Sequence, residues 1–407
     1  MTPTGTAPGS TGGAGTPTRV GVVGCGAISA VYLRQMGAIA DLAVVALADL
    51  DPARAREAAA SCPGARATSV EELLGAPDVD LVVNLTIPAA HAEVSRAALR
   101  AGKHVYAEKP LALDAASGRE VMALAAARAL RVGSAPDTVL GTGTQTARAV
   151  IDSGGIGTPV AATAFVASHG PEGWHPRPSF YYQPGGGPLF DMGPYYLSAL
   201  VHLLGPVTRV TGAARRGEPE RRVGSGPEAG TRIPVEVETH VSGLLEHTSG
   251  ALTTIVTSFE AWAARLPRIE VYGTEAALSS PDPNRFDGSV ERFAPGSKEW
   301  VEVPASAGLV GAERGAGVAE LAGSIASGTP AAASGELGQH VVEIMDALLT
   351  SAKTSSAVEL PPAVRPPAIA LLPVAEAARA QAAAEHVARG DLQAASGAST
   401  SDRGSLR

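Results

Sequence analysis

The chain has 407 residues, of which 45% are hydrophobic and 18% charged, a composition typical of packed globular proteins. Its formal net charge of −8 and the lack of a basic block argue against a nucleic-acid partner. The two cysteines, Cys25 and Cys62, are too few for a disulfide framework and indicate a reducing, cytoplasmic location. No apolar run reaches the ~18 residues that a membrane span needs, so we expect no membrane association.

The length and the low-complexity ends predict the domain plan. A chain of this size exceeds one usual hydrophobic core, so two domains are expected. Both ends are rich in small and polar residues, and the first lacks the basic and apolar regions of a signal peptide. We predict disordered tails at 1–17 and 393–407, a first domain at 18–137, a second at 138–362 and a helical segment at 363–392.

The first domain alternates strand-like and helix-like segments. Four apolar runs have the length and composition of parallel strands buried on both faces: 19–23, 42–48, 81–85 and 104–107. Helix-start signals stand between or after them, namely Asp51 before Pro52, the capping-box pair Ser69 and Glu72, and Asp114. This repetition predicts an α/β Rossmann domain with a doubly wound parallel sheet.

The second domain is richer in strands. Runs with strand character lie at 160–167, 207–213, 232–241, 251–258 and 268–272. Helices are expected at 194–204, near 318–327 and at 338–352. Strands that follow one another without intervening helices predict an α+β domain with a large, mostly antiparallel open sheet. One face of such a sheet is left free for subunit pairing, so we expect a homodimer or homotetramer.

A glycine-rich turn joins the first strand to the first helix. Residues 20–29 read VGVVGCGAIS, with Gly24 placed for a tight turn and Gly26 placed where a pyrophosphate approaches a helix N-terminus. Ser29 stands at the third glycine position, where a small residue is tolerable for helix–strand packing. The predicted dinucleotide-binding loop contains Gly24, Cys25, Gly26, Ala27 and Ile28.

An acidic residue ends the second strand at the spacing that the dinucleotide fingerprint requires. Asp49 is placed to accept hydrogen bonds from ribose hydroxyls and to repel a 2′-phosphate, which favours NAD over NADP. Arg54 and Arg56 follow closely and could attract such a phosphate. NAD is therefore the expected cofactor, with NADP not excluded.

Two further segments carry a family resemblance. Residues 80–113 contain AGKHVYAEKPLAL, and residues 185–204 read GGGPLFDMGPYYLSALVHLL. Together with the glycine loop, they resemble the glucose–fructose oxidoreductase / inositol dehydrogenase / MocA (Gfo/Idh/MocA) family over about residues 18–362. The resemblance implies a Rossmann domain, an α/β domain with a large open sheet, and a sugar, cyclitol or related polyol as substrate.

The resemblance also implies roles for residues near the cofactor. Thr86 and Pro88 match the strand-end turn that lies along the cofactor, and His91 opens the following helix beside it. Glu108 and Lys109 match the Glu-Lys-Pro signature, in which the lysine faces both nicotinamide and substrate.

On the substrate side, Asp191 matches the aspartate of the family's Asp-x-Gly-x-His motif, but Tyr195 stands in place of its histidine. Residues 134–137, SAPD, replace an Arg-Phe pair found in many relatives. Trp174 and His175 belong to a ring-rich loop that could line a sugar pocket, or could equally be a structural lid or subunit contact.

Hydride transfer from an alcohol leaves a proton that a side chain must accept. Lys109 can do so if its surroundings lower its pKa towards neutrality, and Tyr195 or His175 are alternative carriers. No metal site is expected, because the histidines lack ligand spacing. We therefore predict an NAD(P)-dependent dehydrogenase or reductase acting on a polyol CH–OH group. The alternatives are an NAD-dependent glycosidase that uses transient hydride transfer and a non-catalytic, cofactor-loaded sugar sensor.

Overall fold

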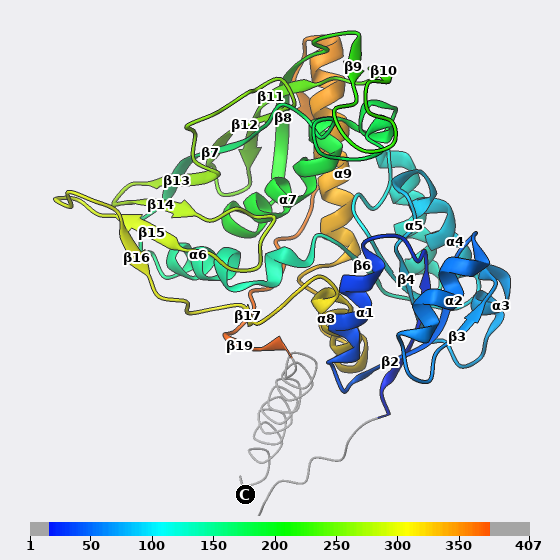
Figure 1. Ribbon diagram of the computed structural model, residues 1–407. Coiled ribbons are helices and arrows are strands. Elements are labelled where there is room, and N and C mark those ends of the chain that lie inside the picture. The colour runs from blue at the N-terminus through cyan, green and yellow to red at the C-terminus, as the bar shows by residue number, and fades with distance from the viewer. Residues whose placement is uncertain (1–15, 375–407) are drawn as a thin grey trace, which may run out of the picture.

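The computed structural model describes residues 16–374. The predicted tail at 393–407 and nearly all of the tail at 1–17 lie outside the described residues. Two sheets form the framework, one of six strands and one of nine, and α9 (Gly335–Thr354) stands between the parts of the molecule that contain them (Figure 1).

The six-stranded sheet has the order β3-β2-β1-β4-β5-β6, and every neighbouring pair is parallel. Its strands are β1 Thr18–Val23, β2 Leu42–Ala48, β3 Arg66–Thr68, β4 Leu81–Asn84, β5 His104–Ala107 and β6 Val132–Ser134. The helices between them are α1 Ser29–Gly37, α2 Pro52–Ala60, α3 Val70–Gly75, α4 His91–Arg100 and α5 Ala115–Ala127. The predicted doubly wound parallel sheet is confirmed, although β3 and β6 were not predicted.

Side-chain caps start three of these helices where the sequence predicted them. The Asp51 carboxylate accepts from the backbone N–H of Ala53, and that of Asp114 accepts from Ser117. Ser69 and Glu72 form a complete capping box. Each cap satisfies a backbone donor that the first helical turn leaves unpaired, so these starting points are confirmed.

The nine-stranded sheet has the order β16-β15-β14-β13-β7-β12-β11-β8-β18. Its neighbours are antiparallel except for the parallel pair β7 and β12, so the mostly antiparallel sheet is confirmed. Its strands are β7 Pro159–Ala167, β8 Val207–Arg215, β11 His240–His247, β12 Leu252–Ser258, β13 Ile269–Gly273, β14 Ala277–Ser280, β15 Val290–Phe293, β16 Val301–Val303 and β18 Val358–Glu359.

One predicted strand is wrong in extent. The run at 232–241 is split, because β10 (Arg232–Pro234) pairs with β9 (Glu220–Arg222) in a separate hairpin and β11 begins only at His240. The residues between the two strands, 235–239, alternate apolar and polar side chains, and this pattern predicts a continuous strand.

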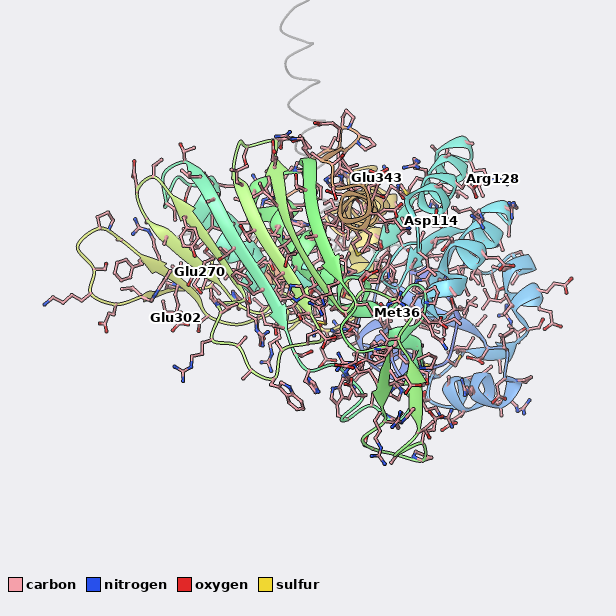
Figure 2. All side chains as sticks on the ribbon, turned by 90° about the horizontal axis from the view of Figure 1, so that it is seen from above. Met36, Asp114, Arg128, Glu270, Glu302 and Glu343 are labelled. Atoms are coloured by element: carbon pink, nitrogen blue, oxygen red, sulfur yellow. The ribbon has the colours of Figure 1, made fainter. Side chains whose placement is uncertain are left out.

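Helices cover one face of the large sheet. α6 (Thr142–Asp152), α7 (Gly187–Leu204) and α9 pack on it, and Figure 2 shows the strands standing beside the end-on α9. Burial alternates along β7, where Ala162, Ala164 and Val166 are buried. Leu244 on β11 and Tyr272 on β13 remain partly exposed, so the opposite face is open.

The later helices connect the two sheets. α8 (Ala316–Ser327) returns to the first sheet, where Val318 and Leu321 pack in one cluster with Val20 and Tyr106. α9 contacts β6 and α5 on one side and β8 and α7 on the other. The residues that complete the first sheet's core therefore come partly from the second half of the chain.

The helix predicted for 363–392 is absent from the part of that segment that the structure describes. Residues 363–373 contain no helix, and β19 (Leu372–Pro373) pairs in parallel with β17 (Leu309–Val310). The prolines at 366 and 367 lack the N–H groups that a helix interior requires, which explains the extended path. The remaining residues, 375–392, lie outside the described chain.

Three buried histidines lie in the second half. His340, on α9, accepts a hydrogen bond at Nε2 from the Val207 N–H over 3.0 Å, as the unprotonated nitrogen of a neutral ring. Burial, assisted by His247, lowers the pKa of His340 to about 4. Burial also lowers the pKa of His247 to about 4 and, together with Arg148, that of His202 to about 3.

The neutral ring of His340 predicts a loss of stability in acid. The pKa in the unfolded chain is about 6.5, so below that pH the unfolded state binds a proton that the folded ring resists. The free energy of unfolding should fall as the pH drops from about 6.5 to about 4, by up to ~3 kcal/mol for this ring. Urea unfolding across this range should show a smaller fall for His340→Gln, and equal falls would contradict a neutral His340.

Candidate active site

The glycine loop follows β1 at the carboxyl edge of the parallel sheet. Gly24 has φ +99°, and a Cβ there would lie 2.6 Å from the carbonyl carbon and oxygen of Leu85. A Cβ on Gly26 would meet no atom within 4 Å. Gly24 is therefore required by the protein's own packing, whereas Gly26 leaves open space at the start of α1. The Ser29 hydroxyl donates to the Gly26 carbonyl over 2.7 Å, so the serine tightens the turn.

Asp49 ties the loop to the end of β2. Its Oδ2 accepts from the Cys25 N–H and its Oδ1 from the Asp51 N–H, both over 2.8 Å. Arg54 is drawn towards Asp51, with 3.7 Å between Nε and Oδ2, and so has a carboxylate of its own. The structure thus places the Asp49 carboxylate against the glycine loop, and its contact with a ribose stays a prediction.

Two apolar side chains project into solvent next to this loop. Leu50 is 97% exposed after β2, and Ile87 is 69% exposed after β4. Sequence reasoning did not select either residue, because a single apolar residue in a loop has no pattern. Exposed apolar surface at a strand edge is the kind of surface that an aromatic base covers. Together with the space at Gly26 and the carboxylate of Asp49, these side chains fit a dinucleotide.

The two loop glycines allow a matched test. Gly26→Ala should keep the wild-type melting temperature but weaken NADH binding by about tenfold or more, because its methyl group fills space where phosphates approach the backbone. Gly24→Ala adds the same methyl group and should lower the melting temperature. Thermal melts without cofactor and NADH fluorescence titrations measure the two effects. Equal destabilisation of the two variants would contradict the separate roles.

The carboxylate of Asp49 predicts the cofactor preference. Asp49→Ser should lower kcat/KM with NAD by about 10- to 100-fold, the loss expected for hydrogen bonds to ribose hydroxyls. The relative use of NADP should rise, because repulsion of a 2′-phosphate disappears. Steady-state assays with both cofactors check this, with Asp51→Ser as the control. An unchanged NAD-to-NADP ratio would show that Asp49 does not read the ribose.

The turn after β4 is held from below by buried side chains. Asn84 donates through Nδ2 to the His91 carbonyl, and its Oδ1 accepts from the Thr86 hydroxyl over 2.6 Å. The ring of buried His91 lies 2.7 Å from the Pro110 carbonyl and 3.0 Å from that of Thr86. Burial lowers the pKa of His91. The structure therefore places Thr86 and Pro88 at the edge of the site and His91 beneath it.

Lys109 connects the first sheet to α7. Its Nζ donates to the backbone carbonyl of Asp191 over 2.7 Å and lies 3.2 Å from Asp191 Oδ1. The two side chains are 18% and 24% exposed, so the pair borders a space open to a ligand. The Lys109 ammonium also lies 5.1 Å from the centroid of the Tyr195 ring. The structure brings together Lys109, Asp191 and Tyr195, the three predicted catalytic residues.

The expected lowering of the Lys109 pKa is wrong. Burial acts to lower it, but Tyr195, Asp191 and Glu108 together outweigh burial, and the pKa of Lys109 is raised. Glu108 also shapes the turn, since its Oε1 accepts from the Tyr32 hydroxyl and its Oε2 from the Lys109 N–H, both over 2.8 Å. Lys109 is therefore held as an ammonium, ready to donate a hydrogen bond.

Arg314 and Asn284 were missed by the sequence reasoning. The hydroxyl of Tyr195 accepts from Arg314 Nη2 over 3.3 Å, and the same nitrogen donates to Asn284 Oδ1 over 2.5 Å. Arg314 stands just before α8, and buried Asp137 accepts from the N–H groups of Gly315 and Gly317 there. Burial raises the pKa of Asp137 to about 6. The SAPD segment, noted only as a departure from relatives, thus supplies the cap that fixes Arg314.

The ring-rich loop reaches the site through Tyr181. His175 lies edge-on to Phe180 and to Tyr181, with 5.4 Å between ring centroids in each pair. Burial and the Asp191 carboxylate raise the pKa of Tyr181 to about 12, against the opposing charge of Lys109. Trp174 is mostly exposed beside His175. The structure places His175 against Tyr181 and Trp174 against His175, and His175 makes no hydrogen bond to Lys109 or Asp191.

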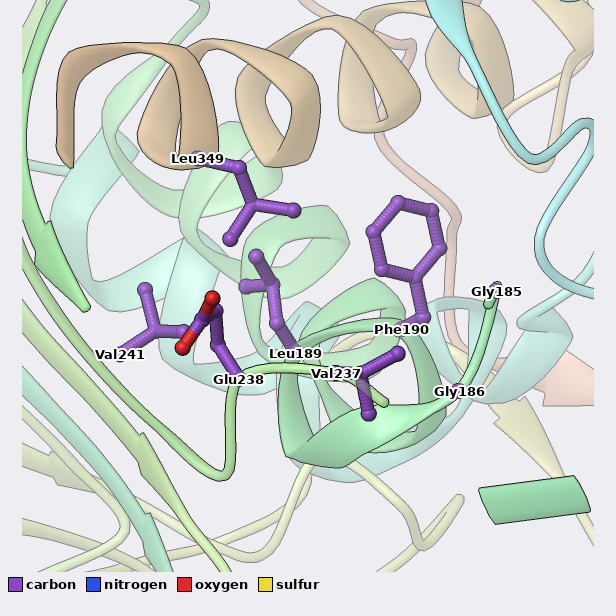
Figure 3. A pocket seen from close by; sticks show the side chains of 8 residues that line it. All are labelled: Gly185, Gly186, Leu189, Phe190, Val237, Glu238, Val241 and Leu349. Atoms are coloured by element: carbon purple, nitrogen blue, oxygen red, sulfur yellow. The ribbon is translucent and has the colours of Figure 1, made fainter. Parts of the chain in front are cut away.

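A separate small cavity of about 70 Å³ lies behind α7 (Figure 3). Leu189 and Phe190 of α7 face Leu349 of α9 across it, with Glu238 at its side. None of the predicted catalytic residues lines this cavity.

Residues 16–374 contain no group of three or more His, Cys, Asp or Glu side chains that could hold a metal ion. Within the same residues, no helix has the length and apolar character needed to cross a membrane.

Comparison with known proteins agrees with this architecture. Residues 18–135 match the oxidoreductase family with an NAD-binding Rossmann fold, and residues 144–279 match the GFO/IDH/MocA C-terminal domain. A dTDP-3,4-didehydro-2,6-dideoxy-alpha-D-glucose 3-reductase from Saccharopolyspora spinosa is 30% identical over 304 residues, or 68% of this chain and 87% of the relative. The chain belongs to the GFO/IDH/MocA family. The predicted resemblance is confirmed, and the protein is an NAD-binding oxidoreductase.

Other family members differ in substrate. A 1,5-anhydro-D-fructose reductase from Ensifer adhaerens is 33% identical over 53% of this chain and 61% of its own length. An inositol 2-dehydrogenase from Rhizobium meliloti is 28% identical over 64% of this chain and 75% of its own length. The structure of a levoglucosan dehydrogenase with NADH and L-sorbose has a TM-score of 0.72 at 22% identity, covering 84% of this chain and 99% of that one. That last likeness supports the fold.

Proposed function

We propose that this GFO/IDH/MocA protein is an NAD-dependent dehydrogenase or reductase that interconverts a hydroxyl and a carbonyl group on a sugar or cyclitol. The observation that carries the proposal is the position of the Lys109 ammonium, between the carboxyl edge of the parallel sheet and Asp191 on α7. The substrate class is supported by the sugar and inositol oxidoreductases among its relatives.

The cofactor site is formed by the glycine loop and the two strand ends beside it. We assign it to Gly24, Cys25, Gly26, Ala27, Ile28, Asp49, Thr86 and Pro88, with Glu108 and His91 acting through the backbone they hold. When bound, the nicotinamide supplies or accepts the hydride. The protein's part is to hold the substrate carbon close to it and to manage the proton on oxygen.

Lys109 is the first candidate for the group that exchanges a proton with the substrate oxygen. Its raised pKa keeps the amine charged at neutral pH, so the ammonium donates a hydrogen bond to the substrate oxygen and, during reduction, can pass its proton to the more basic alkoxide that forms. Asp191 holds the amine in place and can accept from a second hydroxyl of the substrate. Tyr195, whose oxygen accepts from Arg314, keeps its own hydrogen available for the same substrate oxygen. Trp174 and His175 border the entrance through Tyr181.

The alternative functions have less support. The relatives described above are reductases and dehydrogenases, so neither glycoside cleavage nor a sensor role is proposed. We further propose that copies pair through the open face of the nine-stranded sheet, where Leu244, Leu252 and Tyr272 are partly exposed. The two free cysteines support a cytoplasmic location.

Replacement of Lys109 tests the proposal. Lys109→Met should lower kcat by about 10²- to 10⁴-fold, the usual contribution of a positioned acid or base. NADH binding, followed by fluorescence, should persist. Lys109→Arg should also lose turnover, because a planar guanidinium keeps the charge but presents its donors in a different geometry from a compact ammonium. NAD(P)H absorbance with a panel of sugars and cyclitols provides the assay.

The control for this test is Lys298→Met, which removes an exposed lysine and should behave as wild type. Normal turnover by Lys109→Met would refute the catalytic role. Absence of turnover of every sugar and cyclitol by the wild-type protein would refute the proposed substrate class.

A further inference from the structure

Arg314 is a partly buried guanidinium that has no carboxylate partner in the described part of the chain. Its Nη2 makes both of its hydrogen bonds, to the neutral oxygens of Tyr195 and Asn284. Nη1 and Nε donate to no group among residues 16–374, and no ion pair joins Arg314 to a carboxylate there. Neither nitrogen is among the buried polar atoms that lack a partner, so both reach solvent and are free to donate to a ligand.

Among residues 16–374, the fold treats the two buried arginines, Arg148 and Arg221, differently. Arg148 pairs with Asp152 over 3.1 Å. Arg221 lies 3.1 Å from Glu172 and 2.5 Å from Glu260. Carboxylates therefore neutralise the buried guanidinium groups that serve structure, and Arg314 differs from them in having none.

The carboxylates near Arg314 bind other groups. Asp191 is paired with Lys109, Glu108 accepts from Tyr32 and the Lys109 amide, and Asp137 accepts from the amides at the start of α8. Asp137 and Glu108 help to raise the pKa of Arg314, after the contribution of Tyr195 and against that of burial, but neither touches it. The unpaired positive charge at this site is therefore that of Arg314.

Arg314 also lies at a suitable distance from the reacting position. Its Cζ is 5.8 Å from the centroid of the Tyr195 ring, and Lys109 Nζ is 5.1 Å from the same centroid. The two cations thus border the same aromatic ring. A substrate whose oxygen meets Lys109 can place a second group against Arg314.

We propose that Arg314 binds a carboxylate of the substrate, which makes the preferred substrate an acidic sugar, such as an aldonic or uronic acid, or its keto form. Because Nη2 already donates to Asn284 and Tyr195, a substrate carboxylate accepts a single charge-assisted hydrogen bond, from Nη1 or from Nε, whose N–H groups point in different directions. Asn284 and Tyr195 hold Nη2 and so fix the plane of the guanidinium. This inference rests on the proposed function, because it takes Lys109 as the group that faces the reacting oxygen.

The test compares neutral sugars with the matching acids on the full-length protein. The probes are glucose, gluconate and glucuronate with NAD, and the corresponding keto compounds with NADH. Wild type should prefer an acid over its neutral counterpart by about 100-fold in kcat/KM, as expected for a hydrogen bond between two charged groups. Arg314→Met should reduce this preference to about threefold or less, and Arg314→Lys should retain an intermediate preference.

Arg128→Met is the control, because it removes an arginine that is exposed at the end of α5, on the far side of the first sheet (Figure 2). Thermal melts verify that each Arg314 variant is folded. A wild-type enzyme that prefers the neutral sugar, or an acid preference that survives Arg314→Met, would overturn the proposal.

A binding measurement separates this inference from the proposed function. Calorimetric titration of gluconate or glucuronate into the NADH complex should detect binding that Arg314→Met weakens by about 100-fold. Binding of this kind without turnover would refute the proposed reaction and leave the carboxylate contact standing. Turnover of neutral sugars alone, with no binding of acids, would refute the carboxylate contact and leave the reaction standing.

Discussion

The contact between the Lys109 ammonium and Asp191 is the constraint on which the site depends. Lys109 follows β5 of the parallel sheet, and Asp191 lies on α7, one of the helices that cover the large sheet. A shift of the two sheets by about 1 Å would change the geometry of the pair and of any substrate between them. α9 prevents such a shift, because it packs against strands of both sheets along its length.

The electrostatics of the site follow from the same arrangement. Tyr195 is bordered by two cations, Lys109 and Arg314, so its ring and hydroxyl experience positive charge from two sides. Asp191 compensates one of these charges through a direct contact. Because the groups are partly shielded from water, each charge acts more strongly here than at the surface. A site of this kind is prepared for an oxygen on which negative charge develops.

Local sequence patterns were sufficient for the first sheet. Apolar runs located β2 and β5, and caps such as Asp114 located helix starts, because these signals depend only on neighbouring residues. Lys109 and Asp191 were found through a family resemblance. Arg314 and Asn284 were not found, because they lie about 90 to 120 residues beyond Tyr195 in the chain, and nothing near them in sequence marks a shared site. Only the fold brings Arg314 to Tyr195 and Asn284 to Arg314. The raised pKa of Lys109 likewise depends on partners that only the fold brings together.

The return of α8 to the first sheet limits how the protein can be divided. Val318 and Leu321 fill one side of the core that the first 137 residues leave open, beside Tyr106. A fragment ending near residue 137 would expose that apolar surface to water and would tend to aggregate. Engineers who want the cofactor-binding half as an independent module would need to graft residues 316–327 back onto it. The boundary between the halves is thus a property of three-dimensional packing and does not correspond to one cut in the chain.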